Sequence, residues 1–145
     1  RVLPLLLFIA AACGSASGNR PADVAKPDID VQQVGGALFF GSSGLAPVSI
    51  EVSIRNNATV PLRVREVELR SPGMMQYTLT RATKTFNETI PPGQSRTVGL
   101  VATAYKNNPR EVSSEPLTIQ AVVRFDVNGR GFREIVMERF AGPGM

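Results

Sequence analysis

Apolar residues occupy every second position along several stretches of this chain, most clearly over 48–55 and 117–127. In the first stretch valine and isoleucine alternate with serine, glutamate and arginine, and the second carries the longest alternation in the sequence. Successive side chains of a β-strand point to opposite faces of a sheet, so a period of two is typical of strands with one buried face. No helical period interrupts these stretches. The pattern therefore favours an all-β protein.

Thirteen glycines and eleven prolines divide the alternating stretches into short segments. Such spacing indicates antiparallel strands joined by turns. We therefore predict an immunoglobulin-like or fibronectin type III-like antiparallel β-sandwich of seven to eight strands, with a small closed barrel as the alternative. The predicted strands are 29–34, 37–41, 47–55, 61–70, 75–81, 96–105, 116–127 and 131–140.

Two features predict local irregularities in these strands. The apolar phase that includes Val64 resumes one position late at Val67, which predicts a β-bulge near Arg65-Glu66. The pair Asn128-Gly129 is the strongest short hairpin signal, since both residues tolerate positive φ.

Direct pairing across the turn at Asn128-Gly129 places Phe125 opposite Phe132. A second bulge near Arg133-Glu134 would then bring Ile135 to the buried face, and we expect one there.

The chain begins with Arg1, continues with apolar residues and proline to Ala12, and then reaches Cys13 and Gly14. This run is much shorter than the about 20 apolar residues that span a bilayer, and it has the length of a signal-peptide core. Small residues before a cysteine and a glycine after it resemble the lipobox of bacterial lipoproteins. That family prefers leucine three positions before the cysteine, where this chain has Ala10.

The lipobox resemblance implies that Cys13 is the lipidation site, carrying a diacylglycerol after the preceding residues are removed. The protein would then contact the membrane through its lipid anchor. Gly14 in place of an aspartate is compatible with the periplasmic side of the outer membrane in a Gram-negative cell. The alternatives are an ordinary secretory signal cleaved after Ala12, or a buried strand from Leu5 to Ile9.

These assignments divide the chain into four parts: a signal peptide at 1–12, an acylated cysteine and flexible linker at 13–28, a β-sandwich domain at 29–140 and a disordered tail at 141–145. The linker is predicted from its small polar residues and its prolines, which cannot bury enough apolar surface to fold alone.

The composition argues against several functions. The chain has no histidine and one cysteine, so it lacks the commonest general base and the commonest metal ligands. We therefore expect no enzyme activity, no cofactor and no metal site. The formal charge of +4 is spread along the chain without a basic cluster, which argues against a nucleic-acid partner. Glu66 and Glu68 among nearby arginines are typical of an ordinary solvated sheet face.

Two turn motifs are similar to those of late-embryogenesis-abundant type 2 domains, the LEA14-like family of water stress and hypersensitive response. A strand over 48–55 runs into an asparagine-rich turn at 56–59 and then Pro61, and the run 90–95 reads Ile-Pro-Pro-Gly-Gln-Ser. The family's Asn-Pro-Asn turn lacks its proline here. The resemblance covers roughly 47–140 and implies a β-sandwich without catalytic residues. We expect a membrane-anchored binding or structural module with an envelope partner, or alternatively a LEA-like domain protecting against desiccation.

Overall fold

The computed structural model describes residues 18–108, 110 and 114–142. Over this part of the chain the secondary structure consists of eight strands, and no helix is long and apolar enough to cross a bilayer. The strands are β1 (Asp28–Val34), β2 (Leu45–Arg55), β3 (Leu62–Arg70), β4 (Tyr77–Leu79), β5 (Ala82–Ile90), β6 (Ser95–Lys106), β7 (Leu117–Val127) and β8 (Arg130–Phe140).

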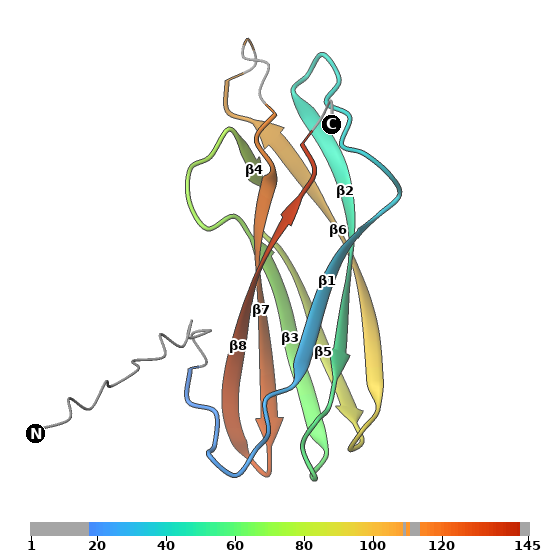
Figure 1. Cartoon of the computed structure of the whole chain (residues 1–145), viewed down its shortest axis with the longest axis vertical. Coiled ribbons are helices and arrows are strands. Elements are labelled where there is room, and N and C mark those ends of the chain that lie inside the picture. Colours follow the sequence, from blue (N-terminus) through green and yellow to red (C-terminus); the bar gives the residue numbers. More distant parts are fainter. Residues whose placement is uncertain (1–17, 109, 111–113, 143–145) are drawn as a thin grey trace, which may run out of the picture.

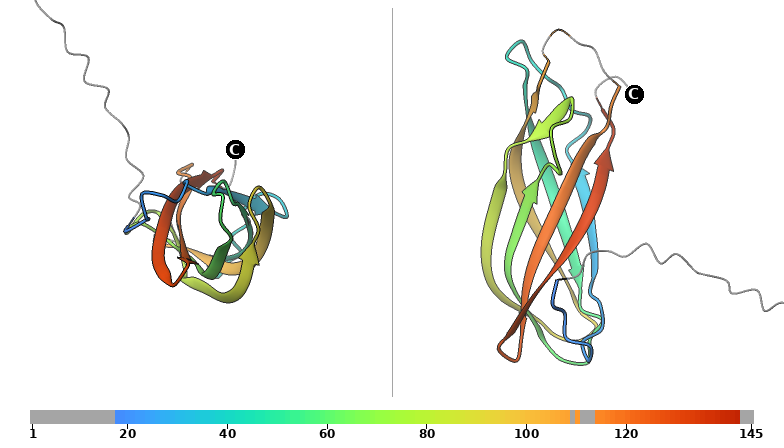
Figure 2. Two further views of the ribbon diagram at one scale, coloured as in Figure 1. Left: turned by 90° about the horizontal axis from the view of Figure 1, so that it is seen from below. Right: turned by 90° about the vertical axis from the view of Figure 1, so that its left-hand side faces the viewer.

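The strands form two four-stranded antiparallel sheets that face each other around a common core (Figures 1 and 2). One sheet has the order β1-β2-β6-β4 and the other β5-β3-β7-β8. The first three strands of the one sheet and the last three of the other match the A-B-E and C-F-G order of immunoglobulin-like sandwiches. The predicted antiparallel β-sandwich is therefore confirmed.

The core consists of the inward residues of the alternating strands. In β2 the four apolar residues of the sequence pattern are all buried, and the residues between them face outward. β7 is central in its sheet and is the most completely buried strand. The largest fully buried apolar side chains are Tyr77, Phe125, Ile50, Ile54, Leu62, Leu69, Ile90, Leu117 and Ile119.

The bulge predicted near Arg65 is confirmed. Val64 pairs with Phe125 and Glu66 pairs with Arg124, so Arg65 is the extra residue of β3. The hairpin predicted between the last two strands is also confirmed, and both turn residues, Asn128 and Gly129, have positive φ, at 51° and 76°.

One predicted strand is wrong and one observed strand was missed. Residues 37–41 belong to the loop between β1 and β2, where Phe39 is exposed and Phe40 stacks on Tyr77 at 4.9 Å between ring centroids. β5 was not predicted, because this edge strand buries only Ile90 fully and its other residues are mostly polar. An edge strand with one weakly buried face carries little apolar alternation.

The bulge predicted at Arg133-Glu134 is absent. β7 and β8 pair without interruption, with Phe125 opposite Phe132 and Val123 opposite Glu134. The carboxylate of Glu134 therefore points to the buried face, where the prediction had placed an apolar residue. Ile135 instead lies opposite Val122 on the outer face.

The prediction of a flexible linker over 13–28 is wrong for its described second part. Gly18 forms a β-bridge with Arg133 of β8, Val24 is buried in the core, and Asn57 donates a hydrogen bond to the Lys26 carbonyl at 3.2 Å. We call residues 18–27 the N-terminal strap. Cys13 and the residues of the predicted signal peptide lie outside the described part of the chain.

The first residues of the predicted disordered tail also pack. Gly142 is buried against the backbone of Ser114 and Glu115, so closely that a β-carbon at this position would overlap the Glu115 carbonyl. The strap lies near the end of the sandwich that holds the β7–β8 turn, whereas β8 ends toward the opposite end (Figure 1).

Candidate anion-binding surface

The outer face of the β5-β3-β7-β8 sheet carries the charged residues that alternate with the core residues of β3 and β7. The register places Glu66 opposite Arg124 and Glu68 opposite Val122. The bulge at Arg65 keeps Val67 in the core while both glutamates stay on the outer side. Local alternation and one inserted residue thus concentrate charge on this face.

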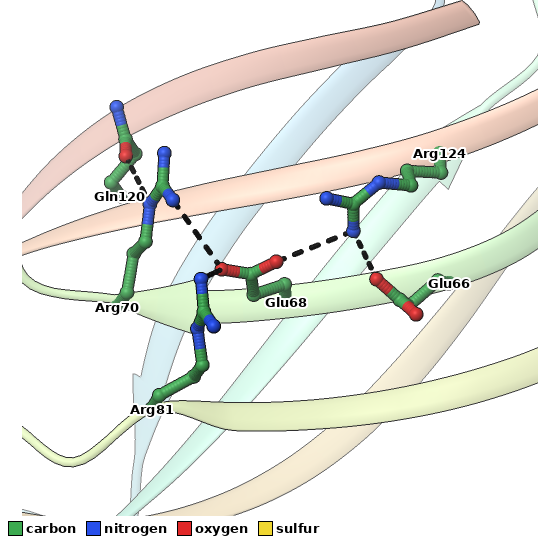
Figure 3. Close-up of polar contacts among 6 residues, drawn as sticks. All are labelled: Glu66, Glu68, Arg70, Arg81, Gln120 and Arg124. Atoms are coloured by element: carbon green, nitrogen blue, oxygen red, sulfur yellow. Dashed lines mark hydrogen bonds and ion pairs between the residues drawn. The ribbon is translucent and has the colours of Figure 1, made fainter.

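Glu68 is the centre of an ion-pair network on this face (Figure 3). Its Oε1 lies 2.8 Å from Arg81 Nη2 and 3.6 Å from Arg70 Nη1, and its Oε2 lies 3.3 Å from Arg124 Nη1. Arg124 also pairs with Glu66. Three arginines from three strands or their borders therefore converge on one carboxylate.

The Glu68 side chain is only 6% exposed, so its charge depends on these partners. Burial raises the pKa of Glu68, but the hydrogen bond from Arg124 and the charges of Arg81 and Arg70 outweigh burial and hold the pKa below its ordinary value. The carboxylate is thus held ionised by its partners. Both of its oxygens lie within ion-pair distance of an arginine.

Next to this network lies an open hollow of about 590 Å³. Its wall includes three arginines, Arg65, Arg124 and Arg133, together with Asp126 and the first residues of the strap. The complete lining is Gly18, Asn19, Arg65, Arg124, Phe125, Asp126, Gly131, Phe132 and Arg133.

Two of the three arginines in the hollow are uncompensated. The guanidinium groups of Arg65 and Arg133 form no hydrogen bond or ion pair with any residue in the described part of the chain, whereas Arg124 pairs with the two glutamates. Asp126 contributes a carboxylate to the wall, and one of its oxygens accepts a hydrogen bond from the Gly129 amide at 3.1 Å.

The pairing of β7 with β8 sets Arg124 directly opposite Arg133. Like charges at directly opposed positions of an antiparallel pair repel each other. A guanidinium presents a planar set of donors that fits carboxylate and phosphate oxygens. The arrangement can therefore bind an anion, which would relieve this repulsion.

The sequence interpretation of these arginines as an ordinary solvated face missed their juxtaposition. Two signals were present: Arg65 is the inserted residue at the phase slip, and counting outward from the Asn128-Gly129 turn places Arg124 opposite Arg133. The contribution of the strap could not be found in this way, because Gly18 and Asn19 read as linker.

No group of three or more cysteine, aspartate or glutamate side chains that could hold a metal ion occurs among the described residues. Cys13, the predicted lipidation site, lies five positions before Gly18, the first described residue. The strap thus connects the hollow to the segment that carries this cysteine.

The fold and this surface define the class: an antiparallel β-sandwich with an arginine-rich outer face. No family model matches the sequence, and no curated protein matches it. The Northeast Structural Genomics Consortium target SoR45 is similar in structure, with a TM-score of 0.52 and 15% identity over 83% of this chain and 88% of that one.

A protein from Bordetella pertussis that carries the provisional name ApaA is similar to the same degree. Its TM-score is 0.52 and its identity 15%, and the alignment covers 83% of this chain and 94% of that chain. At such identity the two likenesses show the fold alone.

Proposed function

We propose that this chain is an exported lipoprotein of the bacterial cell envelope, anchored to a membrane through a lipid on Cys13. Its β-sandwich then acts as a non-catalytic binding or structural module for another component of the envelope. The observation that carries the proposal is the position of the only cysteine. It follows an apolar segment of signal-peptide length and precedes the folded strap by five residues.

The non-catalytic part of the proposal is supported by the chemistry of the surface. The sequence contains no histidine, and the two glutamates of the outer face pair with arginines. The neighbouring arginines hold the pKa of Glu68 below its ordinary value, which makes this carboxylate a poor general base. The free arginines suit binding better than proton transfer.

Acylation is tested by expressing the gene with its own N-terminal region in a bacterial host and measuring the intact mass of the membrane fraction. We expect a chain that begins at Cys13 and carries a diacylglyceryl group on the thiol. The variant Cys13→Ser should leave the protein unacylated. As a matched control, Ser17→Cys in the Cys13→Ser background keeps one cysteine but displaces it from the motif, and it should also remain unacylated. An unmodified Cys13 in the mature protein would overturn the proposal.

A second candidate, a LEA-like protective domain, is favoured by one observation. The two turn motifs of that resemblance meet in space, because the buried Asn56 side chain donates to the Val60 and Ile90 carbonyls at 2.9 Å each. Drying a labile enzyme with the purified domain tests this candidate. Recovery of activity should exceed that with an equal mass of albumin, and equal recovery would remove the candidate.

A further inference from the structure

We infer that the arginine hollow binds the phosphate groups of anionic lipids in the membrane that carries the anchor. This inference rests on the proposed function, since it needs the domain to be held at a membrane. It adds a ligand class and a site: the headgroup phosphate as ligand, and Arg65 and Arg133 as its donors.

The first argument is the reach of the chain. Gly18 is five positions after Cys13, and five steps of a fully extended chain span at most about 18 Å. Gly18 and Asn19 themselves line the hollow. An acyl group on Cys13 would therefore keep the hollow within about one headgroup layer and a short gap of the bilayer surface. A flexible linker running to residue 28 would have imposed no such limit.

The second argument is the charge balance at this end of the molecule. Five arginines surround the strap and the hollow, and three of them have acidic partners. Arg20 pairs with Glu134, Arg130 pairs with Asp23, and Arg124 pairs with Glu66 and Glu68. The remaining two are Arg65 and Arg133. The carboxylate of Asp126 in the same wall offsets part of their charge but pairs with neither of them. No described acidic side chain of the domain pairs with either guanidinium group. We therefore expect an anion from outside the domain to balance their charge.

The third argument is local geometry. Gly18 forms two backbone hydrogen bonds with Arg133, each 3.2 Å long, and a β-carbon at this position would lie 3.0 Å from Arg133 Nε. The absence of a side chain at Gly18 thus leaves space for the Arg133 side chain beside the strap. On the other side of the hollow, the bulge adds Arg65 to the wall.

A phosphate ligand could come from a lipid or from solution, and the tether favours the lipid. Anchoring raises the local concentration of headgroups far above that of free phosphate, so even a weak site would be occupied. An arginine near an anionic membrane surface strengthens binding about fivefold, and two such residues act together.

The test uses the mature chain, residues 13–145, with Cys13→Ser, so that no acyl chain contributes to binding. Co-sedimentation with vesicles of phosphatidylcholine and phosphatidylglycerol is compared with vesicles of phosphatidylcholine alone, at about 0.1 M salt, where the Debye length is about 10 Å. We expect binding only to the anionic vesicles. The double variant Arg65→Gln/Arg133→Gln should lower the partition coefficient about thirtyfold.

The matched control is Arg110→Gln/Arg139→Gln, which removes the same charge from two exposed positions, one in the loop between β6 and β7 and one at the end of β8 away from the β7–β8 turn. It should bind within about threefold of the parent, because charges farther than a Debye length from the surface contribute little. Circular dichroism and the thermal midpoint are measured for both variants to check that they fold.

Two outcomes would overturn the inference: no binding to anionic vesicles, or an equal loss of binding in both double variants. If vesicles are not bound but inorganic phosphate shifts the Arg65 and Arg133 Nε–H resonances, the hollow is a site for soluble phosphate. Failure of acylation in the host is a separate result, because the vesicle experiment contains no acylated protein.

Discussion

At the scale of single residues, Asn56 shows how one polar side chain joins two turns. It is fully buried, and its amide donates to two carbonyls while its oxygen accepts from the Ala58 amide at 2.8 Å. Its backbone also bonds to Gly93 and Gln94. Each buried polar group that loses its partner costs about 1–3 kcal/mol. Asn56 therefore holds the β2–β3 turn against the β5–β6 turn.

Replacing this residue by Asn56→Ala should lower the free energy of unfolding by about 3 kcal/mol, because two carbonyls and one amide lose their partner in the interior. Urea denaturation measures the change. The neighbouring Asn57→Ala, which removes one exposed hydrogen bond to the Lys26 carbonyl, should cost less than about 1 kcal/mol. Equal losses in the two variants would contradict the assigned role.

Glu134 is the opposite case, a buried acid with incomplete compensation. Neither of its carboxylate oxygens accepts a hydrogen bond from the described residues, and its one ion pair is with Arg20 Nε at 3.5 Å. Burial raises the pKa of Glu134 above its usual value of 4.5, although Arg20 and Lys26 act to lower it. The ionised form therefore destabilises the fold.

The raised pKa sets the sign of a pH dependence. Glu134 takes up a proton more readily in the folded domain than in the unfolded chain, so its contribution is most favourable below the unfolded pKa and falls as the pH rises through the folded pKa. Glu134→Gln should remove this dependence and raise stability at pH 7 by about 1 kcal/mol.

Thermal unfolding between pH 4 and 8 measures the effect, with Glu138→Gln on the same strand as the control. A Glu134→Gln protein that is less stable than the parent at pH 7 would show that the pair with Arg20 outweighs the cost of burial. Glu68 has a lowered pKa, so its contribution is present above the unfolded pKa and is lost as the pH falls through the folded one.

At the scale of elements, the N-terminal strap acts as a short additional edge piece on β8. It covers the edge through the Gly18–Arg133 bridge and inserts Val24 into the core. Covering an edge strand protects it from pairing with another chain. The strap also covers the inward Glu134, whose only ion pair is with Arg20 of the strap.

The variant Val24→Ala should loosen the strap, because it removes apolar surface that is 97% buried and costs about 1–2 kcal/mol. We expect faster hydrogen exchange of the Arg133 amide, which donates to the Gly18 carbonyl at 3.2 Å. Val101→Ala, at a site that is 73% exposed, should leave this exchange unchanged. Unchanged exchange in both variants would mean that Val24 does not hold the strap.

At the scale of the whole molecule, the strap makes the folded unit larger than the alternating strands alone. The unit extends from Gly18 to Gly142, and its two sheets share one core. The surface with uncompensated arginines lies beside the strap and hence beside the proposed anchor.

The fragment 18–142 should therefore unfold with the same midpoint as the mature chain, whereas 28–142 should lose about 3 kcal/mol. The shorter fragment lacks the buried Val24, the two hydrogen bonds of Gly18 and the cation beside Glu134. Urea denaturation compares the two. Identical midpoints would show that the strap adds nothing to the stability of the domain.

The sequence by itself determined seven of the eight strands, the sandwich, the bulge at Arg65 and the turn at Asn128-Gly129. These features depend on alternation and on backbone preferences of a few neighbouring residues, which are local properties. The predicted register even placed Phe125 opposite Phe132, as observed.

Only the tertiary structure decided the position of the strap, the strand β5 and the burial of Glu134. Each depends on a partner far away in the sequence: Arg133 for Gly18, β3 for β5, and Arg20 for Glu134. The arginine hollow likewise combines residues of the strap, β3, β7 and β8. Local patterns carry no information on which distant segments compensate a buried charge or cover an edge, and for that reason this surface required the folded chain.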